Sequence, residues 1–142
     1  MPMLLPRLAA GLIFLSEGIQ KYLFPDTLGT ARFAKTGFSN PAFWAYFVGA
    51  FEVVCGILIL IGLLTRLAAI VLLLVMIVAF ITTKYPELIN KGFWFMAHDY
   101  RTDFAMTLLL IYLLIHGGGN FSTDKRIADS KSFKNSQRKE PA

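Results

Sequence analysis

The chain has 142 residues, of which 56% are hydrophobic and only 16% carry a formal charge, whereas about a quarter of the residues in a soluble domain are charged. This composition argues against an ordinary water-soluble domain, and a single cysteine, Cys55, excludes an internal disulfide pair, a Cys-ligated zinc site and an iron–sulfur cluster on this chain alone. Much of the net charge of +5 comes from the C-terminal end, so we expect contact with anionic lipid headgroups of a bilayer and no binding of nucleic acid.

Four apolar blocks, each near the length of about 20 residues that a membrane helix needs, follow one another along the chain. The uninterrupted part of the fourth, residues 104–115, would span only about 18 Å as a helix. That helix must therefore begin earlier, near residue 98, and it ends before three consecutive glycines. We predict an all-α integral membrane protein, an up-and-down four-helix bundle with helices near residues 3–24, 41–64, 66–83 and 98–116.

Residues 123–142 differ from the rest of the chain, because they are rich in Ser, Lys, Asn and Gln and poor in apolar residues. We expect a single membrane domain over residues 1–122, followed by a basic, disordered tail. Four spans put both termini on one side of the membrane. Because that side carries slightly more Lys and Arg, mostly in the tail, we expect both termini to be cytoplasmic.

Charged side chains inside the first predicted helix indicate a functional site, since an ionisable group at membrane depth normally faces the interior of the bundle. Arg7 and Lys21 fall on one helical stripe together with two glycines. Glu17 precedes Lys21 by four residues, a spacing that favours an ion pair.

Glu52, in the second predicted helix, is the first candidate for a catalytic residue. It lies near mid-membrane on a stripe with glycines that let a neighbouring helix come close. An unpaired carboxylate there would tend to take up a proton. Either Glu52 is a titrating acid, or a basic side chain approaches it from Arg7, Lys21 or Arg66.

Asp103, in the fourth predicted helix, is a second candidate acid that should face inward, with Asp99 one turn nearer the surface. The alternative is a carboxylate that only favours the first turn of its helix. His98 and His116 are the only histidines and lie eighteen residues apart, about 27 Å along one helix, so no haem shared by the two is expected. His98 and the two aspartates alone could bind a metal, and we expect no metal site.

Each of these charges also has a purely structural explanation. Glu52, like the pair of Glu17 and Lys21, could form a fixed salt bridge. Arg66 lies at a tight turn between two predicted helices, where it can cap a helix or set the topology. Arg7 lies near a helix end and could extend to the membrane surface.

Short motifs recur in a fixed order along the chain: Arg7-x3-Gly11, Phe14-Leu15-x2-Gly18-x2-Lys21, Gly37-Phe38-Ser39-Asn40-Pro41, Gly49-x2-Glu52-x3-Gly56, Gly62-Leu63-Leu64-Thr65-Arg66 and Asp103-Phe104-Ala105. This order resembles the DoxX family of small four-helix membrane proteins of bacteria. The stretch Gly117 to Asp124 resembles the family's Gly-Pro-Gly-Arg-Phe-Ser-x-Asp ending but lacks its proline and arginine. The resemblance implies a multi-pass protein of the bacterial inner membrane.

The resemblance also implies a link to quinone-dependent oxidoreductases, because the family includes a subunit of a thiosulfate:quinone oxidoreductase and a member of a mycobacterial membrane oxidoreductase complex. We therefore expect a membrane subunit with an oxidoreductase partner, with a quinone as its cofactor and no redox metal of its own. Glu52 and Asp103 would handle protons. The residues expected to bind the quinone are Arg7, Lys21, Arg66 and Glu17.

A second hypothesis is a non-enzymatic membrane scaffold or small-solute carrier, in which the same buried charges form a structural salt-bridge network. Substitution of Glu52 would then lower the amount of folded protein rather than an activity. Under either hypothesis, the glycine faces could support a homo-oligomer.

Overall fold

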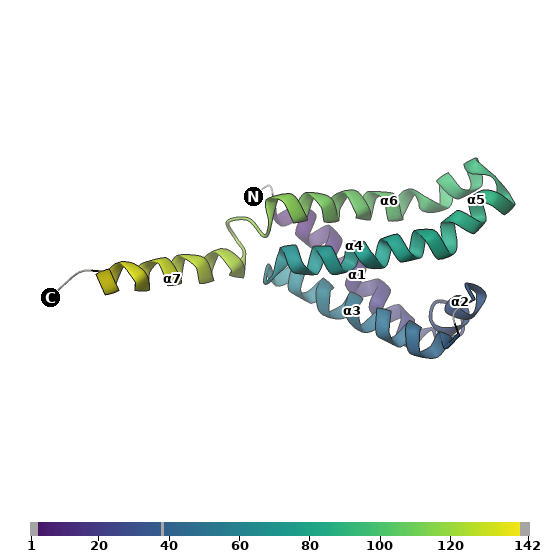
Figure 1. Cartoon of the computed structure of the whole chain (residues 1–142), viewed down its shortest axis with the longest axis horizontal. Helices are drawn as coiled ribbons and strands as arrows, with labels where there is room; N and C mark the ends of the chain where they lie inside the picture. Colours follow the sequence, from purple (N-terminus) through teal and green to yellow (C-terminus); the bar gives the residue numbers. More distant parts are fainter. Residues whose placement is uncertain (1–2, 38, 140–142) are drawn as a thin grey trace.

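The computed structural model describes residues 3–37 and 39–139, and each regular element within these ranges is a helix. The prediction of an all-α chain is therefore confirmed. The long helices form an elongated body; the chain starts near one end of it, and the C-terminal segment projects away from that same end (Figure 1). These helices are α1 (Leu4–Leu23), α3 (Pro41–Ile61), α4 (Thr65–Ala79) and α6 (Phe93–His116).

The body consists of two helical hairpins. Helix α1 packs along α3, and α4 packs along α6, while α3 and α4 connect the hairpins. In Figure 1 the hairpins lie close together at the end where the chain starts and separate toward the opposite end, where the short helix α2 (Thr30–Lys35) lies.

Glycines allow the close packing of α1 on α3. A Cβ atom added at Gly18 would lie 2.8 Å from the carbonyl oxygen of Gly49, and one added at Gly56 would lie 2.9 Å from the backbone nitrogen of Leu15. Both contacts are with backbone, which cannot rotate away as a side chain can. A larger residue at either position would therefore push the two helices apart.

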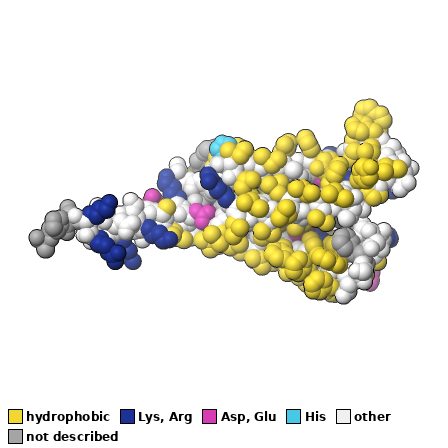
Figure 2. Space-filling model, viewed as in Figure 1, with side chains coloured by type: hydrophobic (Ala, Val, Ile, Leu, Met, Phe, Trp, Pro, Cys, Tyr) yellow, Lys and Arg dark blue, Asp and Glu magenta, His cyan; other side chains and the backbone are white. Residues whose placement is uncertain are grey.

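The buried apolar core lies between the hairpins and includes Phe14, Ile59, Leu72, Leu110 and Leu113. Cys55 belongs to this core as a buried free thiol. Many other large apolar side chains are exposed on the outside of the body, and Figure 2 shows them covering its visible face. An outer surface of this kind suits a bilayer rather than water.

The prediction of four helices is too low, because the chain forms additional helices between and after the long ones. Helix α4 continues through a π-helical segment, η1 (Phe80–Lys84), into α5 (Tyr85–Lys91). The helical run does not end at residue 83 as predicted, and Pro86 occupies the first turn of α5, where its missing N–H is not needed. Helix α6 begins at Phe93, after Gly92 at φ 89°, and so starts five residues before the predicted position.

Two helical segments of the described chain are long and apolar enough to cross a membrane, Pro41–Ile61 and Thr65–Lys91. The charges of α1 and α6 dilute their apolar character. Length and composition alone therefore identify fewer spans than the four that the sequence predicts.

The tail differs from its prediction. Instead of disorder, the structure has a helix, α7 (Thr123–Lys139), with no buried residue. Its Lys, Arg, Gln and Ala residues are good helix formers, which explains a helix without tertiary packing. Figure 2 shows its Lys and Arg side chains apart from the apolar body. Residues 140–142 of the predicted tail lie outside the described residues.

Candidate functional site

A cavity of about 650 Å³ lies between the two hairpins, toward the end where they separate. Most of its lining is apolar, with aromatic rings from Phe14, Phe47 and Phe51 and aliphatic side chains from α4. Charged lining residues come from three helices: Glu17 and Lys21 from α1, Glu52 from α3 and Asp103 from α6. Four of the six predicted site residues thus line one cavity.

The shortest charged contact on the cavity wall joins Lys21 to Glu52. The Lys21 Nζ atom donates to Glu52 Oε2 at 2.6 Å, and both side chains are 7% exposed. The sequence left open which basic residue approaches Glu52, and the structure identifies Lys21. Glu17 is a second, more distant partner, with its Oε2 atom 3.9 Å from Lys21 Nζ and its side chain 46% exposed.

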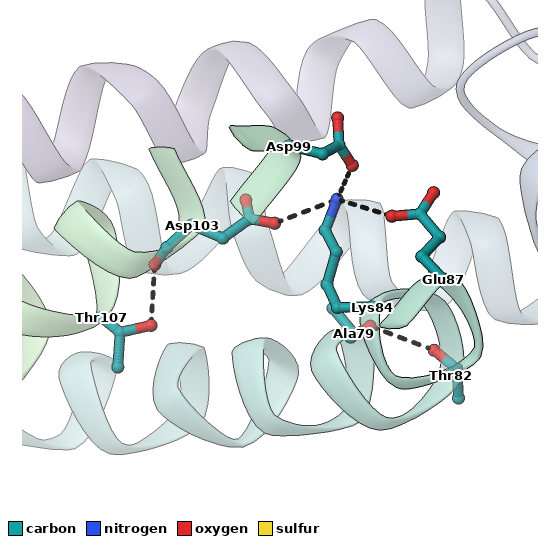
Figure 3. A network of polar contacts seen from close by, with 7 residues as sticks. All are labelled: Ala79, Thr82, Lys84, Glu87, Asp99, Asp103 and Thr107. Atoms are coloured by element: carbon teal, nitrogen blue, oxygen red, sulfur yellow. Dashed lines mark hydrogen bonds and ion pairs between the residues drawn. The ribbon is translucent and has the colours of Figure 1, made fainter. Parts of the chain in front are cut away.

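A second cluster surrounds the buried side chain of Lys84, at the end of η1 (Figure 3). Lys84 donates to Asp99, and its Nζ atom lies 3.7 Å from Asp103 Oδ2 and 4.0 Å from Glu87 Oε2. Of these residues, only Asp103 also lines the cavity. Asp103 therefore connects the Lys84 cluster to the cavity wall.

Carboxylates outnumber ammonium groups around the cavity. Lys21 contacts two carboxylates and Lys84 contacts three, so the two clusters together carry an excess of negative charge when all groups are ionised. This excess favours hydrogen-bond donors and cations as ligands and disfavours anions.

Arg7 lies outside the cavity, at the end of the body near the termini. Its guanidinium donates to four backbone carbonyls: Ile59 at 3.0 Å, Leu60 at 2.8 Å, Gly118 at 3.2 Å and Phe121 at 3.2 Å. The first two belong to the end of α3, and the others belong to the loop after α6. Arg7 thus satisfies helix-end carbonyls and fastens three segments together.

Arg66 also lies outside the cavity and is exposed, with its Nη2 atom donating to the Ile115 carbonyl at 3.1 Å. This contact caps the end of α6, in agreement with the structural explanation for Arg66. The structure therefore does not bring Arg7 or Arg66 to the residues predicted to share a ligand with them.

The sequence did not predict two side-chain contacts, one made by Lys84 and one made by Asp124. The contact between Lys84 and Asp99 was missed because Lys84 follows the predicted third helix, which ends at residue 83, and because a spacing of fifteen residues gives no signal of contact. Asp124 was noted only as the end of a motif, but its carboxylate accepts from the backbone nitrogens of Leu64 at 2.7 Å and Thr65 at 3.1 Å. It thereby caps the start of α4 from a distant part of the chain.

Comparison with known proteins supports the resemblance seen in the motifs. The chain is 48% identical over 128 residues to "Uncharacterized membrane protein Rv3486" of Mycobacterium tuberculosis, covering 86% of this chain and 78% of that protein. It is 31% identical over 130 residues to "Putative oxidoreductase CatD" of Bacillus subtilis, covering 90% of this chain and 88% of that protein. No solved structure matches the chain. The pattern that defines DoxX matches residues 3–85, which include the Lys21–Glu52 pair, and the chain therefore belongs to the DoxX family of membrane proteins.

Proposed function

We propose that this protein is a membrane subunit of a quinone-linked oxidoreductase system and that its cavity binds the quinone. The observation that carries the proposal is the buried Lys21–Glu52 pair on the wall of a mostly apolar cavity. A buried ion pair at membrane depth is a candidate functional site by its physical cost alone. The relative of Bacillus subtilis, named as an oxidoreductase, supports the same class of chemistry.

The cavity has the properties expected of a site for an apolar ring with a few polar atoms. Its volume of about 650 Å³ falls within the usual range for small-molecule sites, roughly 300–1,000 Å³. Aromatic side chains with exposed faces, among them Phe47 and Phe51, offer surfaces on which a quinone ring can stack. Few polar groups interrupt this surface, and they are the ones able to orient a ligand.

The residues of the cavity have separate roles in this proposal. Lys21 holds the Glu52 carboxylate in position on the cavity wall through their ion pair. Glu52 and Asp103 hold protons on opposite sides of the cavity. A bound quinone would supply two-electron chemistry, with a partner subunit as the source or acceptor of the electrons. Arg7 and Arg66 have no contact with the ligand in this proposal, because their guanidinium groups bind backbone carbonyls elsewhere.

We further propose that the protein crosses the bacterial inner membrane several times, with both termini in the cytoplasm. Support comes from α7, whose Lys and Arg residues project from the end of the body that holds the termini (Figure 2). By the positive-inside rule, a basic segment of this kind stays on the cytoplasmic side.

The experiment is to purify the full chain from its native membrane in mild detergent and to measure the quinone bound per protein by organic extraction and mass spectrometry. Near-stoichiometric quinone is expected in the wild type, with a loss of tenfold or more in Glu52→Gln. Asp129→Asn, on exposed α7, serves as the matched control and should retain the quinone. Wild-type protein that is folded but free of quinone would refute the proposal.

The contacts of Arg7 and Arg66 favour a structural role for those two residues, as the scaffold or carrier hypothesis predicts for all the charges. If that hypothesis holds for the cavity as well, Glu52→Gln should reduce the yield of folded protein in the membrane. The remaining folded molecules would then support wild-type activity when reconstituted with their partner. Under the quinone proposal, activity per folded molecule falls instead.

A further inference from the structure

The hydrogen-bonding groups on the cavity wall are unevenly divided between donors and acceptors. Glu17 and Asp103 both line the cavity and are partly exposed, at 46% and 32% of the side chain. Within the described residues, their carboxylates have only long ion pairs, of 3.9 Å to Lys21 and 3.7 Å to Lys84. An ionised carboxylate can only accept hydrogen bonds, so both groups offer acceptor capacity to a ligand.

The ammonium donors near the cavity are directed at the protein itself, whereas the hydroxyls of the lining threonines can accept as well as donate. Lys21 Nζ is 2.6 Å from Glu52 Oε2, and Lys84 Nζ contacts Asp99. The hydroxyl of Thr82, another lining residue, donates to the Val78 carbonyl at 2.8 Å. A ligand that brings its own donors therefore matches this wall better than a ligand that brings only acceptors.

On this basis, and resting on the proposed quinone site, we propose that the cavity binds the reduced, dihydroxy form of the ligand more tightly than the quinone. The two hydroxyl groups of a hydroquinone donate hydrogen bonds, whereas the two carbonyl oxygens of a quinone only accept them. Glu17 lies on the α1 side of the cavity and Asp103 on the α6 side. One acceptor on each wall suits a ring that carries a hydroxyl at each end.

The preference should be large, because a site built to hydrogen-bond a hydroxyl strongly rejects an analogue that lacks it. We expect the reduced form to bind at least about tenfold more tightly. For a two-electron couple, a tenfold preference raises the reduction potential of the bound ligand by about 30 mV. The cavity would thus make its ligand easier to reduce than the same molecule in the bilayer.

The test compares the binding of menadione and of menadiol, its reduced form, to the full chain in lipid nanodiscs. Equilibrium dialysis under anaerobic conditions gives each dissociation constant, and empty nanodiscs correct for partition into lipid. Menadiol should bind at least tenfold more tightly. The dimethyl ether of menadiol, which has the same ring but no donor, should bind no better than menadione.

Two variants test whether Asp103 and Glu17 cause the preference for menadiol. Asp103→Asn and Glu17→Gln replace acceptor-only groups by amides that also donate, so the preference for menadiol should fall severalfold in each. Lys84 keeps Asp99 and Glu87 as partners in Asp103→Asn, and melting temperature verifies that this variant is folded. Asp129→Asn is again the matched control and should leave both dissociation constants unchanged.

The outcomes separate this inference from the proposed function. The inference is overturned if menadione binds to wild-type protein as tightly as menadiol or more tightly. It is also overturned if both variants prefer menadiol as strongly as the wild type does. Either result leaves the proposed quinone site standing. If the dimethyl ether binds as tightly as menadiol, the inference is also overturned, because the shape of the ring rather than its hydroxyl donors would then determine the affinity. If neither redox form binds to folded wild-type protein, the proposed function itself fails.

Discussion

The substitution Lys21→Met tests whether the Lys21–Glu52 pair is a true buried ion pair. Methionine approximates the length of the lysine stem but carries no charge. In the wild type both side chains are 7% exposed, with 2.6 Å between Lys21 Nζ and Glu52 Oε2. Removing the ammonium leaves the Glu52 carboxylate buried without its main partner.

Breaking a buried pair in this way destabilises a protein by about 3–5 kcal/mol, which is more than a hundredfold in the folding equilibrium at 1.4 kcal/mol for each factor of ten. Glu17 does not compensate, since it is also a carboxylate. Replacing both partners, in Lys21→Met/Glu52→Leu, removes the buried carboxylate as well and should leave stability within about 1 kcal/mol of wild type.

The assay is equilibrium unfolding in mixed micelles of mild detergent and SDS, followed by circular dichroism. Lys131→Met, on exposed α7, is the matched control and should leave the free energy of unfolding unchanged within about 0.5 kcal/mol. The reasoning is wrong if Lys21→Met lowers the free energy of unfolding by less than about 1 kcal/mol, or if the double variant is less stable than the single one.

Substitutions at three further positions test the contacts that hold the helices together, and the same unfolding assay measures each. Arg7→Met should lower the free energy of unfolding by at least about 3 kcal/mol because four carbonyls lose a charged donor; stability equal to wild type would contradict this role. Gly56→Val should cost about 1–3 kcal/mol, since its Cβ would meet the Leu15 backbone, and Gly56→Ala should cost less. Asp124→Ala should cost about 1 kcal/mol through loss of a helix cap, whereas Asp124→Asn should recover part of that loss.

The inward-facing charges were predictable from helical spacing, but their partners were not. The spacing placed Arg7 and Lys21 on one stripe of α1, and both are buried as expected. Which of them meets Glu52 depends on how α1 and α3 slide past each other. That register is set by the contacts of Gly18 with Gly49 and of Gly56 with Gly11, which a single sequence does not specify.

The Lys84 cluster was not predictable because it depends on an irregular helix. The third helix was predicted to end at residue 83, just before Lys84, whereas the chain continues through the π-helical segment η1. The wider turn of a π-helix changes the direction of the side chains that follow it. The early start of α6 was also not predicted. Its first turn contains aromatic residues, which are also common at a membrane interface outside a helix.

The contacts of Arg7 have a consequence for the order in which the protein assembles during synthesis. Its partners Ile59 and Leu60 emerge soon after α1, but Gly118 and Phe121 lie 111 and 114 residues further along the chain. The terminal end of the body therefore cannot close until nearly the whole polypeptide has been made. A nascent chain arrested before Gly118 should remain open to trypsin at Arg7, whereas the finished protein should resist cleavage there.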